Sequence, residues 1–491
     1  MTPELDEAAL ALLDAKRLLE LDCLPLSRGT LAFAGAADRE AAEWIAWKLD
    51  RPGMAVEEAL GEALDRLLAQ VRGRVASRPV EDLMELDEGT FSLGEGGSLE
   101  EMRQKSQAEP LVRLVDHILE EAVRQGATDI HVEPGEDGTS VRFRRDGMLR
   151  EHLLLPSWVQ LSLVSRLKIL ASLDIAEKRL PQDGRIALHQ SGADIDVRVS
   201  TLPIRLGEKV VLRLLRQNTK LPDLSDTGMA PGLQAAFEVL CDRPQGMLIV
   251  TGPTGSGKTS TLFAALQRLL PRAINVTTIE DPIEYRLRNA NQVQVHEKAG
   301  LTFAQALRSI LRQDPDVILV GEIRDSETAT IAMQAAQTGH LVFTTLHTND
   351  SAGAVTRLVD LGVPPFIAAN ALLGVLAQRL VRRLCPHCRR TRPATWKEQE
   401  RLKPLGHLAE LTDCVWEAVG CTRCDGTGYQ GRTGIFELMV MDDALRELVS
   451  HGVTEGELRS RSGLVPLLVD GLEKARTGET TLEEVLRVGL R

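Results

Sequence analysis

The chain has 491 residues, a net charge of -12 and an ordinary balance of 43% hydrophobic and 26% charged residues. This length exceeds what one hydrophobic core organises and predicts about three or four domains. Only 3% of the residues are aromatic. The few aromatic residues and the negative charge argue against a protein that binds nucleic acid through base stacking or phosphate contacts.

The N-terminal segment, residues 1–78, has apolar residues at helical spacing, most clearly between Ala59 and Val71, and is expected to be a small, mostly helical module. Its first residues are acidic and lack the layout of a secretory signal, so we expect a cytosolic protein. Residues 79–109 carry nine acidic residues against two basic ones around the glycine-rich SLGEGGS. This composition predicts a flexible acidic linker.

A second domain of α+β type is expected over residues 110–220. Residues 111–125 form an amphipathic pattern of helical period, and segments such as DIHVEP and DIDVRVST alternate apolar and polar residues as half-buried strands do. A further helix is predicted over residues 158–179. Residues 221–231 are expected to be a linker to a third domain.

Residues 232–384 show strand-then-helix patterns that predict a parallel sheet covered on both faces. The apolar stretch VPPFIAANALLGVLAQRLV, residues 363–381, is interrupted by polar residues and is expected to be a buried helix instead of a membrane span. Residues 425–491 are expected to be the helical C-terminal part of this domain.

A phosphate-binding loop is predicted within LIVTGPTGSGKTS, residues 248–260, because the pattern Gly-x4-Gly-Lys-Thr lies between a buried strand and a helix. Glycines let backbone N–H groups surround the β-phosphate, and the helix N-terminus adds partial positive charge. Lys258 is expected to reach the β and γ phosphates of ATP, and the Thr259 hydroxyl to bind Mg²⁺. The residues expected to contact the nucleotide are Gly252, Pro253, Thr254, Gly255, Ser256, Gly257, Lys258, Thr259 and Ser260.

Carboxylates follow two more predicted strands. VILVGEIRD places Glu322 at the carboxyl edge of the sheet, where it could polarise the attacking water, although an ordinary edge carboxylate is the alternative. TIEDPIEY contains Glu280, Asp281 and Glu284. One of these could act as a base or bind Mg²⁺ through water, and the alternative is a solvated strand end.

Two histidines flank a third predicted strand, in GHLVFTTLHTND, residues 339–350. His340 lies at its start and His347 at its end. A lone histidine is commonly structural, but His347 stands where a sensor of the γ-phosphate is needed.

Two CxxC pairs, CPHC and CTRC, are separated by 32 residues and predict a structural Zn²⁺ site in a reducing compartment. They define an insertion, residues 385–424, in which His387 is not an expected ligand. The expected ligands are Cys385, Cys388, Cys421 and Cys424. The basic cluster around CPHC could be solvated or could contact an acidic partner, and it comprises Arg379, Arg382, Arg383, Arg389, Arg390 and Arg392.

In their order and spacing, GPTGSGKT, TIEDPIE, VILVGEIRD and TGHLVFTTLHTND resemble the secretion ATPase superfamily of type II secretion and type IV pilus systems. Further similarity upstream, including ATDIHVEP and DIAEKRLPQDGRI, extends the resemblance over about residues 105–491. It implies a PAS-like α+β domain before a RecA-like P-loop ATPase domain, in a homo-hexamer that binds ATP between the two. Arg185 and Arg198 match the arginines that reach the γ-phosphate in the family. Weaker candidates for that role are Arg142, Arg144, Arg145 and Arg213.

The zinc insertion favours the assembly ATPases within the family. The resemblance implies a type II secretion motor that binds ATP, Mg²⁺ and Zn²⁺ and drives pseudopilus assembly. It implies attachment to the inner membrane through protein partners: the cytoplasmic domain of an anchor, contacted by the N-terminal module, and a platform protein. A type IV pilus extension ATPase is the alternative. A DNA-translocating RecA-like motor is disfavoured by the charge, and an inactive structural ring by the intact Lys258, Thr259 and Glu322.

Overall fold

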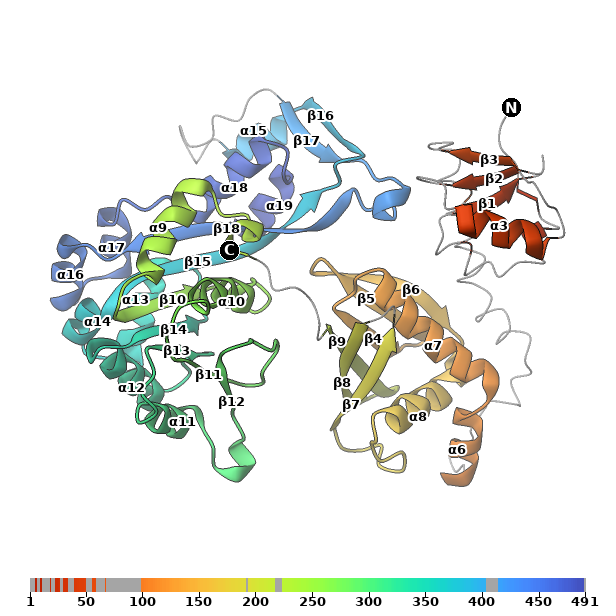
Figure 1. Cartoon of the computed structure of the whole chain (residues 1–491), viewed down its shortest axis with the longest axis horizontal. Coiled ribbons are helices and arrows are strands. Elements are labelled where there is room, and N and C mark those ends of the chain that lie inside the picture. Colours follow the sequence, from red (N-terminus) through yellow and green to blue (C-terminus); the bar gives the residue numbers. More distant parts are fainter. Residues whose placement is uncertain are drawn as a thin grey trace. The chain divides into compact units, whose positions relative to one another are not determined.

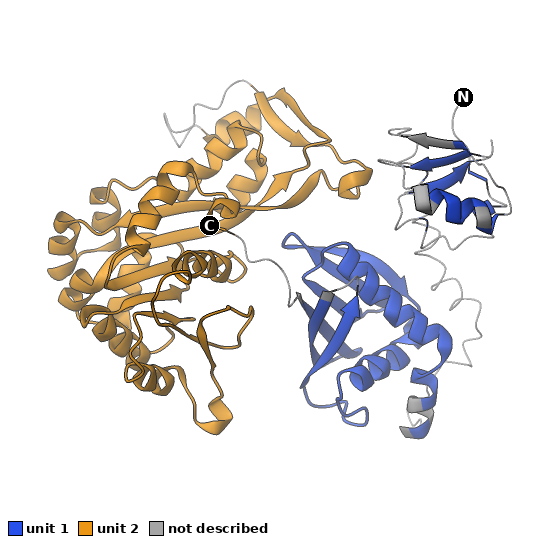
Figure 2. Cartoon of the chain, in the orientation of Figure 1, with its two compact units in different colours: residues 1–216 blue, residues 217–491 orange. Residues whose placement is uncertain are grey.

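The computed structural model describes residues 99–190, 193–216, 223–402 and 414–489, together with short pieces of the chain before residue 68 (Figure 1). Two compact units, residues 1–216 and 217–491, divide the chain (Figure 2).

The described part of the N-terminal module contains a small sheet in the order β1-β2-β3. Strand β1 is antiparallel to β2, and β2 is parallel to β3. The expected mostly helical module is wrong for these residues, because apolar runs of four residues are too short to show a strand period. The helical series that suggested it, 59–71, lies outside the described residues apart from Leu67. The elements are β1 (Cys23–Leu26), β2 (Thr30–Phe33), α3 (Arg39–Lys48) and β3 (Ala55–Glu58).

The end of the predicted acidic linker is helical instead of flexible. Helix α6, Leu99–Ser106, lies inside it, and α7, Glu109–Arg124, begins at its last residue. The sequence LEEMRQKS is composed almost wholly of good helix formers. The linker was predicted from its excess of acidic residues, which does not report helix propensity. Residues 79–98 of that linker lie outside the described residues.

A six-stranded antiparallel sheet forms the rest of the first unit, in the order β6-β5-β4-β9-β8-β7. Alternate strand residues such as Ile130 and Leu212 pack with the buried side of α7 in one hydrophobic core. The helix expected over 158–179 is shorter, since α8 ends at Leu170. The elements are β4 (Asp129–Pro134), β5 (Thr139–Arg145), β6 (Met148–Leu155), α8 (Gln160–Leu170), β7 (Gln182–Gln190), β8 (Ala193–Ile204) and β9 (Gly207–Arg216).

The second unit contains a seven-stranded sheet in the order β12-β11-β13-β14-β10-β15-β18. All neighbouring pairs are parallel except β15 with β18. Met247 and Ile249 of β10 belong to one core and Leu248 and Val250 to another, so both faces are covered, as predicted. The strands are β10 (Gly246–Thr251), β11 (Val276–Glu280), β12 (Asn291–Gln294), β13 (Val317–Val320), β14 (Leu341–Leu346), β15 (Leu372–Leu384) and β18 (Tyr429–Val440).

Helices cover the two faces of this sheet (Figure 1). Residues of α9 and α10 contribute to one core, and residues of α11, α12, α13 and α14 to the other. The linker expected at 221–231 packs into the first of these through Leu224 and Met229. The helices are α9 (Pro231–Cys241), α10 (Lys258–Leu269), α11 (Phe303–Ile310), α12 (Ser326–Gln337), α13 (Ser351–Asp360), α14 (Pro365–Ala371), α15 (Trp396–Leu402), α16 (Asp443–Ser450), α17 (Glu455–Arg461), α18 (Leu467–Arg476) and α19 (Leu482–Gly489).

Two expectations about this sheet are corrected. The apolar stretch 363–381 is not one helix, because α14 gives way to β15 at Leu372. Strand β15 lies between β10 and β18, and periodicity alone does not distinguish a strand buried on both faces from a buried helix. The C-terminal part, 425–491, is not only helical, since it begins with the long edge strand β18.

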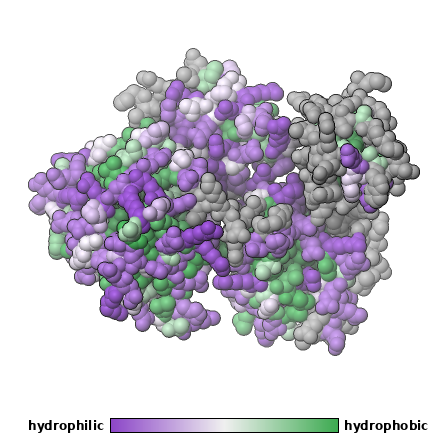
Figure 3. All heavy atoms as spheres, in the orientation of Figure 1, coloured by the Kyte–Doolittle hydropathy of each residue, from purple (hydrophilic) through white to green (hydrophobic). Residues whose placement is uncertain are grey.

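No helix among the described residues is long and apolar enough to cross a membrane. Figure 3 shows hydrophilic residues over much of the visible surface, and smaller hydrophobic areas are scattered among them. The two remaining strands, β16 (Arg389–Pro393) and β17 (Cys414–Ala418), form a separate antiparallel pair beside the cysteines.

Candidate nucleotide-binding site and cysteine cluster

The loop between β10 and α10 has the backbone that a phosphate-binding loop requires. Gly252, Gly255 and Gly257 have φ angles of +150°, +78° and +86°, a region that side chains disfavour. A Cβ atom on Gly252 would lie 2.4 Å from the backbone oxygen of Gln378. The helix that begins at Lys258 presents unpaired N–H groups and partial positive charge to this loop.

Lys258 and Ser256 supply side-chain hydrogen-bond donors at this loop. The Nζ atom of Lys258 donates to the carbonyl oxygens of Gly252 at 2.8 Å and Pro253 at 3.1 Å. Burial, opposed by the charge of Glu322 and aided by that of Arg379, lowers the pKa of Lys258 to about 8. The Ser256 hydroxyl is buried and has no hydrogen-bond partner among the described residues. A buried donor of this kind and a partly desolvated cation are groups that a bound phosphate would satisfy.

Glu322 and His347 lie together beside the loop. Glu322 follows the end of β13 by two residues, and His347 directly follows β14. His347 Nε2 is 3.4 Å from Glu322 Oε2, and Arg324 also pairs with this carboxylate. Burial and then the charge of Lys258 lower the pKa of His347, so its imidazole is neutral at neutral pH. The structure therefore brings Lys258, Glu322 and His347 to one edge of the sheet.

The three acidic residues after β11 differ in their surroundings. Glu280 is buried, and its Oε1 accepts hydrogen bonds from the Thr278 hydroxyl at 2.6 Å and the Gln292 amide at 3.0 Å. Burial raises the pKa of Glu280 despite these bonds. Asp281 and Glu284 are exposed in the segment that follows. Glu280 is thus held by the fold, while Asp281 and Glu284 are accessible to a ligand.

His340 does not join this site. It precedes β14 at the amino end, whereas His347 follows the carboxyl end, and the six residues between them span about 20 Å at about 3.3 Å each. The Nδ1 atom of His340 instead lies 3.0 Å from the carbonyl oxygen of Ala335, which closes the turn after α12.

Two contacts at this edge were not anticipated from the sequence. Thr251 Oγ1 lies 2.7 Å from Thr348 Oγ1 and accepts from the Thr348 N–H at 3.0 Å, which ties the ends of β10 and β14 together. Gln378 of β15 bonds both to the loop and to α10. The register that brings these residues to the loop is set by strand pairing between distant segments, and no local motif announces it.

The two principal candidate arginines lie on adjacent strands of the first unit. Arg185 of β7 is directly opposite Arg198 of β8, and Arg198 is opposite Arg213 of β9. The Arg185 side chain is exposed. Like charges placed opposite each other destabilise a sheet unless acidic groups compensate them.

Three of the weaker arginine candidates have acidic partners. Arg213 Nε donates to Asp129 at 2.9 Å, and Arg144 lies 3.9 Å from the same carboxylate. Arg142 pairs with Glu133. These contacts favour a structural role for Arg142, Arg144 and Arg213.

The four cysteines of the CxxC pairs converge. Their Sγ atoms all lie within 4.8 Å of one another, with separations of 3.9 Å for Cys385–Cys421, 3.8 Å for Cys388–Cys424 and 3.7 Å for Cys421–Cys424. Zinc–sulfur bonds of about 2.3 Å in a tetrahedron require about 3.8 Å between sulfurs. Burial acts to raise the pKa of Cys424, but the N–H groups of Cys421 and Gly428 lower it to about 7. The cluster is therefore compatible with zinc.

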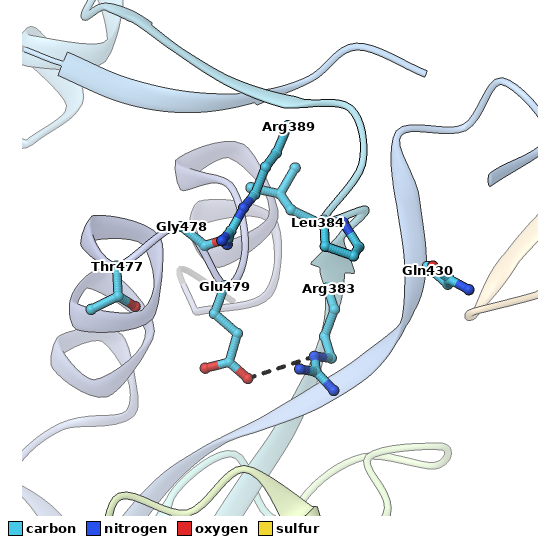
Figure 4. A pocket seen from close by; sticks show the side chains of 8 residues that line it. Arg383, Leu384, Arg389, Gln430, Thr477, Gly478 and Glu479 are labelled. Carbon is cyan, nitrogen blue, oxygen red and sulfur yellow. Dashed lines mark hydrogen bonds and ion pairs between the residues drawn. The ribbon is translucent and has the colours of Figure 1, made fainter. Parts of the chain in front are cut away.

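Several arginines of the basic cluster around CPHC have structural partners. Arg379 donates to the Asn349 carbonyl at 3.0 Å, and Arg382 donates to Glu484 at 2.8 Å. A cleft of about 450 Å³ beside the cysteines is lined in part by Arg383, which lies 3.9 Å from Glu479 (Figure 4). This cleft is near the end of β15 and does not include the phosphate loop.

A protein family described as "Type II/IV secretion system protein" matches residues 104–487. The chain belongs to this family. The type II secretion system protein HxcR of Pseudomonas aeruginosa is 52% identical over 382 residues, which are 77% of each chain. The type IV pilus assembly ATPase PilB of Thermus thermophilus is 49% identical over 380 residues, which are 76% of this chain and 42% of that one.

Among solved structures, the pilus retraction motor PilT with bound ADP is similar with a TM-score of 0.51 and 26% identity, covering 76% of this chain and 95% of that one. The family resemblance and the RecA-like fold expected from the sequence are thereby confirmed. The matched residues span both the six-stranded sheet and the seven-stranded sheet.

Proposed function

We propose that this member of the family is the ATP-hydrolysing motor of a bacterial type II secretion system, which couples hydrolysis to pseudopilus assembly and to the export of folded proteins. The observation that carries the proposal is the convergence of Lys258, Glu322 and His347 beside the glycine loop. The identity of 52% to a type II secretion protein supports the cellular role.

Each of these residues has a chemical role in the proposed reaction. Lys258 neutralises the β and γ phosphates, which its position over the loop allows. Glu322 accepts the proton of the water that attacks the γ-phosphorus, while the bond from that phosphorus to the bridging oxygen of ADP breaks. His347, 3.4 Å from Glu322, orients the carboxylate and responds to the γ-phosphate. Hydrolysis of ATP to ADP and phosphate balances without a further reactant.

Metal ions complete this assignment. Thr259 at the start of α10 would hold Mg²⁺, with Asp281 or Glu284 acting through water, and the ion would neutralise phosphate charge when bound. Glu280, which is buried and hydrogen-bonded, is better suited to positioning this segment than to proton transfer. The four cysteines would hold Zn²⁺ in a structural role.

Arg185 and Arg198 are proposed to stabilise the γ-phosphate in a homo-hexameric assembly. The support for this is that both match the arginines that reach the γ-phosphate in the family, and that Arg185 is exposed opposite Arg198 in the register of β7 and β8. Guanidinium donors of this kind stabilise phosphoryl transfer only when they reach the nucleotide, which would link domain movement to hydrolysis.

The proposed partners are the cytoplasmic domain of an inner-membrane anchor, contacted by residues 1–78, and a membrane platform protein. The role of a type IV pilus assembly ATPase is the second candidate, favoured by the 49% identity to PilB. The two roles differ in their partners, so a pull-down with the N-terminal module against anchors of both systems would discriminate between them.

Replacement of Glu322 by Gln tests the hydrolysis itself. We expect ATP binding to persist while phosphate release falls by about 100-fold or more, since general-base catalysis contributes about that much. Glu327→Gln is the matched control, because Glu327 is exposed on α12 and pairs with Arg308. Phosphate release by Glu322→Gln equal to that of the control would exclude Glu322 as the catalytic carboxylate.

A further inference from the structure

We infer that Gln378 of β15 is a positioning residue that sets the phosphate loop for the β-phosphate, an inference that rests on the proposed nucleotide binding. Gln378 is 2% exposed. Its Nε2 atom donates to the carbonyl oxygen of Ser256 at 2.8 Å, and its Oε1 accepts from the Thr261 hydroxyl at 2.7 Å. One buried amide therefore joins the loop to the first turn of α10.

Strand pairing explains why this side chain lies under the loop. Strands β10 and β15 are parallel, and Thr251 at the end of β10 is opposite Ala377. Gln378 is thus the first residue beyond the paired end of β10, where the loop begins. A Cβ atom on Gly257 would lie 2.8 Å from Gln378 Nε2, so the loop packs directly against this amide.

The contact controls the direction of a backbone donor. The peptide unit that joins Ser256 to Gly257 is planar, so its C=O and N–H groups point in opposite directions. Because Gln378 binds the Ser256 carbonyl, the Gly257 N–H is directed away from β15. In loops of this pattern, that is the side on which backbone N–H groups surround the phosphates. Gln378 therefore acts on the ligand through the Gly257 peptide without touching it.

Replacement of Gln378 by Met tests this role, because Met is of similar length and makes neither bond. The Ser256 carbonyl and Thr261 hydroxyl then lose their buried partner and the loop relaxes. We expect the dissociation constant of Mg·ADP to rise about tenfold, the effect of leaving a buried polar group unpaired. AMP lacks the β-phosphate, so its affinity should change by less than about twofold.

Two control variants separate this role from general stability. Thr261→Val removes the helix-side bond but leaves the bond to Ser256, so its effect on ADP should be smaller than that of Gln378→Met. Thr480 is fully buried, and its hydroxyl donates at 2.7 Å to the carbonyl of Arg382 on β15, the strand that also carries Gln378. Thr480→Val should lower the melting temperature without changing the affinity for ADP.

The measurement is displacement of a fluorescent ADP analogue by ADP and by AMP on the full chain, with thermal melting of each variant. A loss specific to ADP in Gln378→Met supports the inference. Equal losses for ADP and AMP, or no loss, overturn it. Should Gln378→Met fail to fold, Gln378→Asn, which withdraws the amide by one methylene, provides the same comparison. Failure of the unmodified chain to bind ADP would instead overturn the proposed function.

Discussion

Nucleotide affinity should depend on pH through Lys258. Burial lowers the pKa of this lysine to about 8 in the nucleotide-free protein. A bound polyphosphate places negative charge against the ammonium group and raises its pKa again. The protonated form is therefore the one that binds. Affinity should fall as the pH rises from 7 through 8.

The size of the effect follows from that value. With a pKa of about 8, Lys258 is about 91% protonated at pH 7 and about 9% protonated at pH 9, so the dissociation constant of Mg·ADP should rise about tenfold between them. The last phosphate proton is lost near pH 6 and contributes little in this interval. His347, with a pKa below its usual range, is neutral throughout.

Titration calorimetry at pH 7, 8 and 9 measures this dependence. At pH 8, repetition in buffers of different ionisation enthalpy should show uptake of about half a proton per ADP bound. In the Lys258→Arg variant the guanidinium group stays charged from pH 7 to 9. The remaining affinity of this variant for Mg·ADP should therefore not change with pH. If the unmodified chain binds Mg·ADP with the same affinity from pH 7 to 9 and takes up no proton, the assignment of a lowered pKa to Lys258 is refuted.

Arg185→Gln should reduce ATP turnover far more than ADP affinity. Its free energy of unfolding should change by less than about 0.5 kcal/mol, because Arg185 is an exposed residue; a lower melting temperature with unchanged turnover would contradict the proposed role. Metal analysis should give about one zinc ion per chain and less in Cys424→Ser, with a lower melting temperature; zinc-free protein prepared without chelators would exclude that site. Lys168→Met leaves the buried carboxylate of Glu208 unpaired and should lower the free energy of unfolding by about 3–5 kcal/mol in urea denaturation. A loss below about 1 kcal/mol would contradict a buried ion pair there.

The phosphate loop could be predicted because its chemistry is local. Glycines, Lys258 and the flanking strand and helix occupy one continuous segment, so spacing alone specifies the arrangement. Glu322 and His347 were also accessible to sequence reasoning, since the carboxyl ends of parallel strands meet at one edge of a sheet. His340 lies at the start of the same strand, as the sequence indicated, and so at the opposite end of β14 from His347.

Residues that act through long-range pairing could not be found in this way. Gln378 lies in a stretch whose apolar run was interpreted as a helix, which assigns the wrong period and direction to every side chain. The opposition of Arg185 to Arg198 likewise depends on the register of β7 and β8. The N-terminal strands were missed for a different reason, because four residues carry too little pattern to outweigh the helical spacing nearby.

Strand β15 connects the phosphate loop to the cysteine cluster, but its contacts indicate that the two are energetically separable. Gln378 and Cys385 are joined by a segment that pairs with β18 and is also held by the Arg382–Glu484 ion pair and by the bond from the Leu384 N–H to Glu479. A strand fixed on the side of the cysteines by these bonds does not need the metal to keep its register. Loss of zinc should therefore destabilise the insertion while leaving Gln378 under the loop. On this basis the ADP affinity of Cys424→Ser should stay close to that of the unmodified chain, in contrast to Gln378→Met.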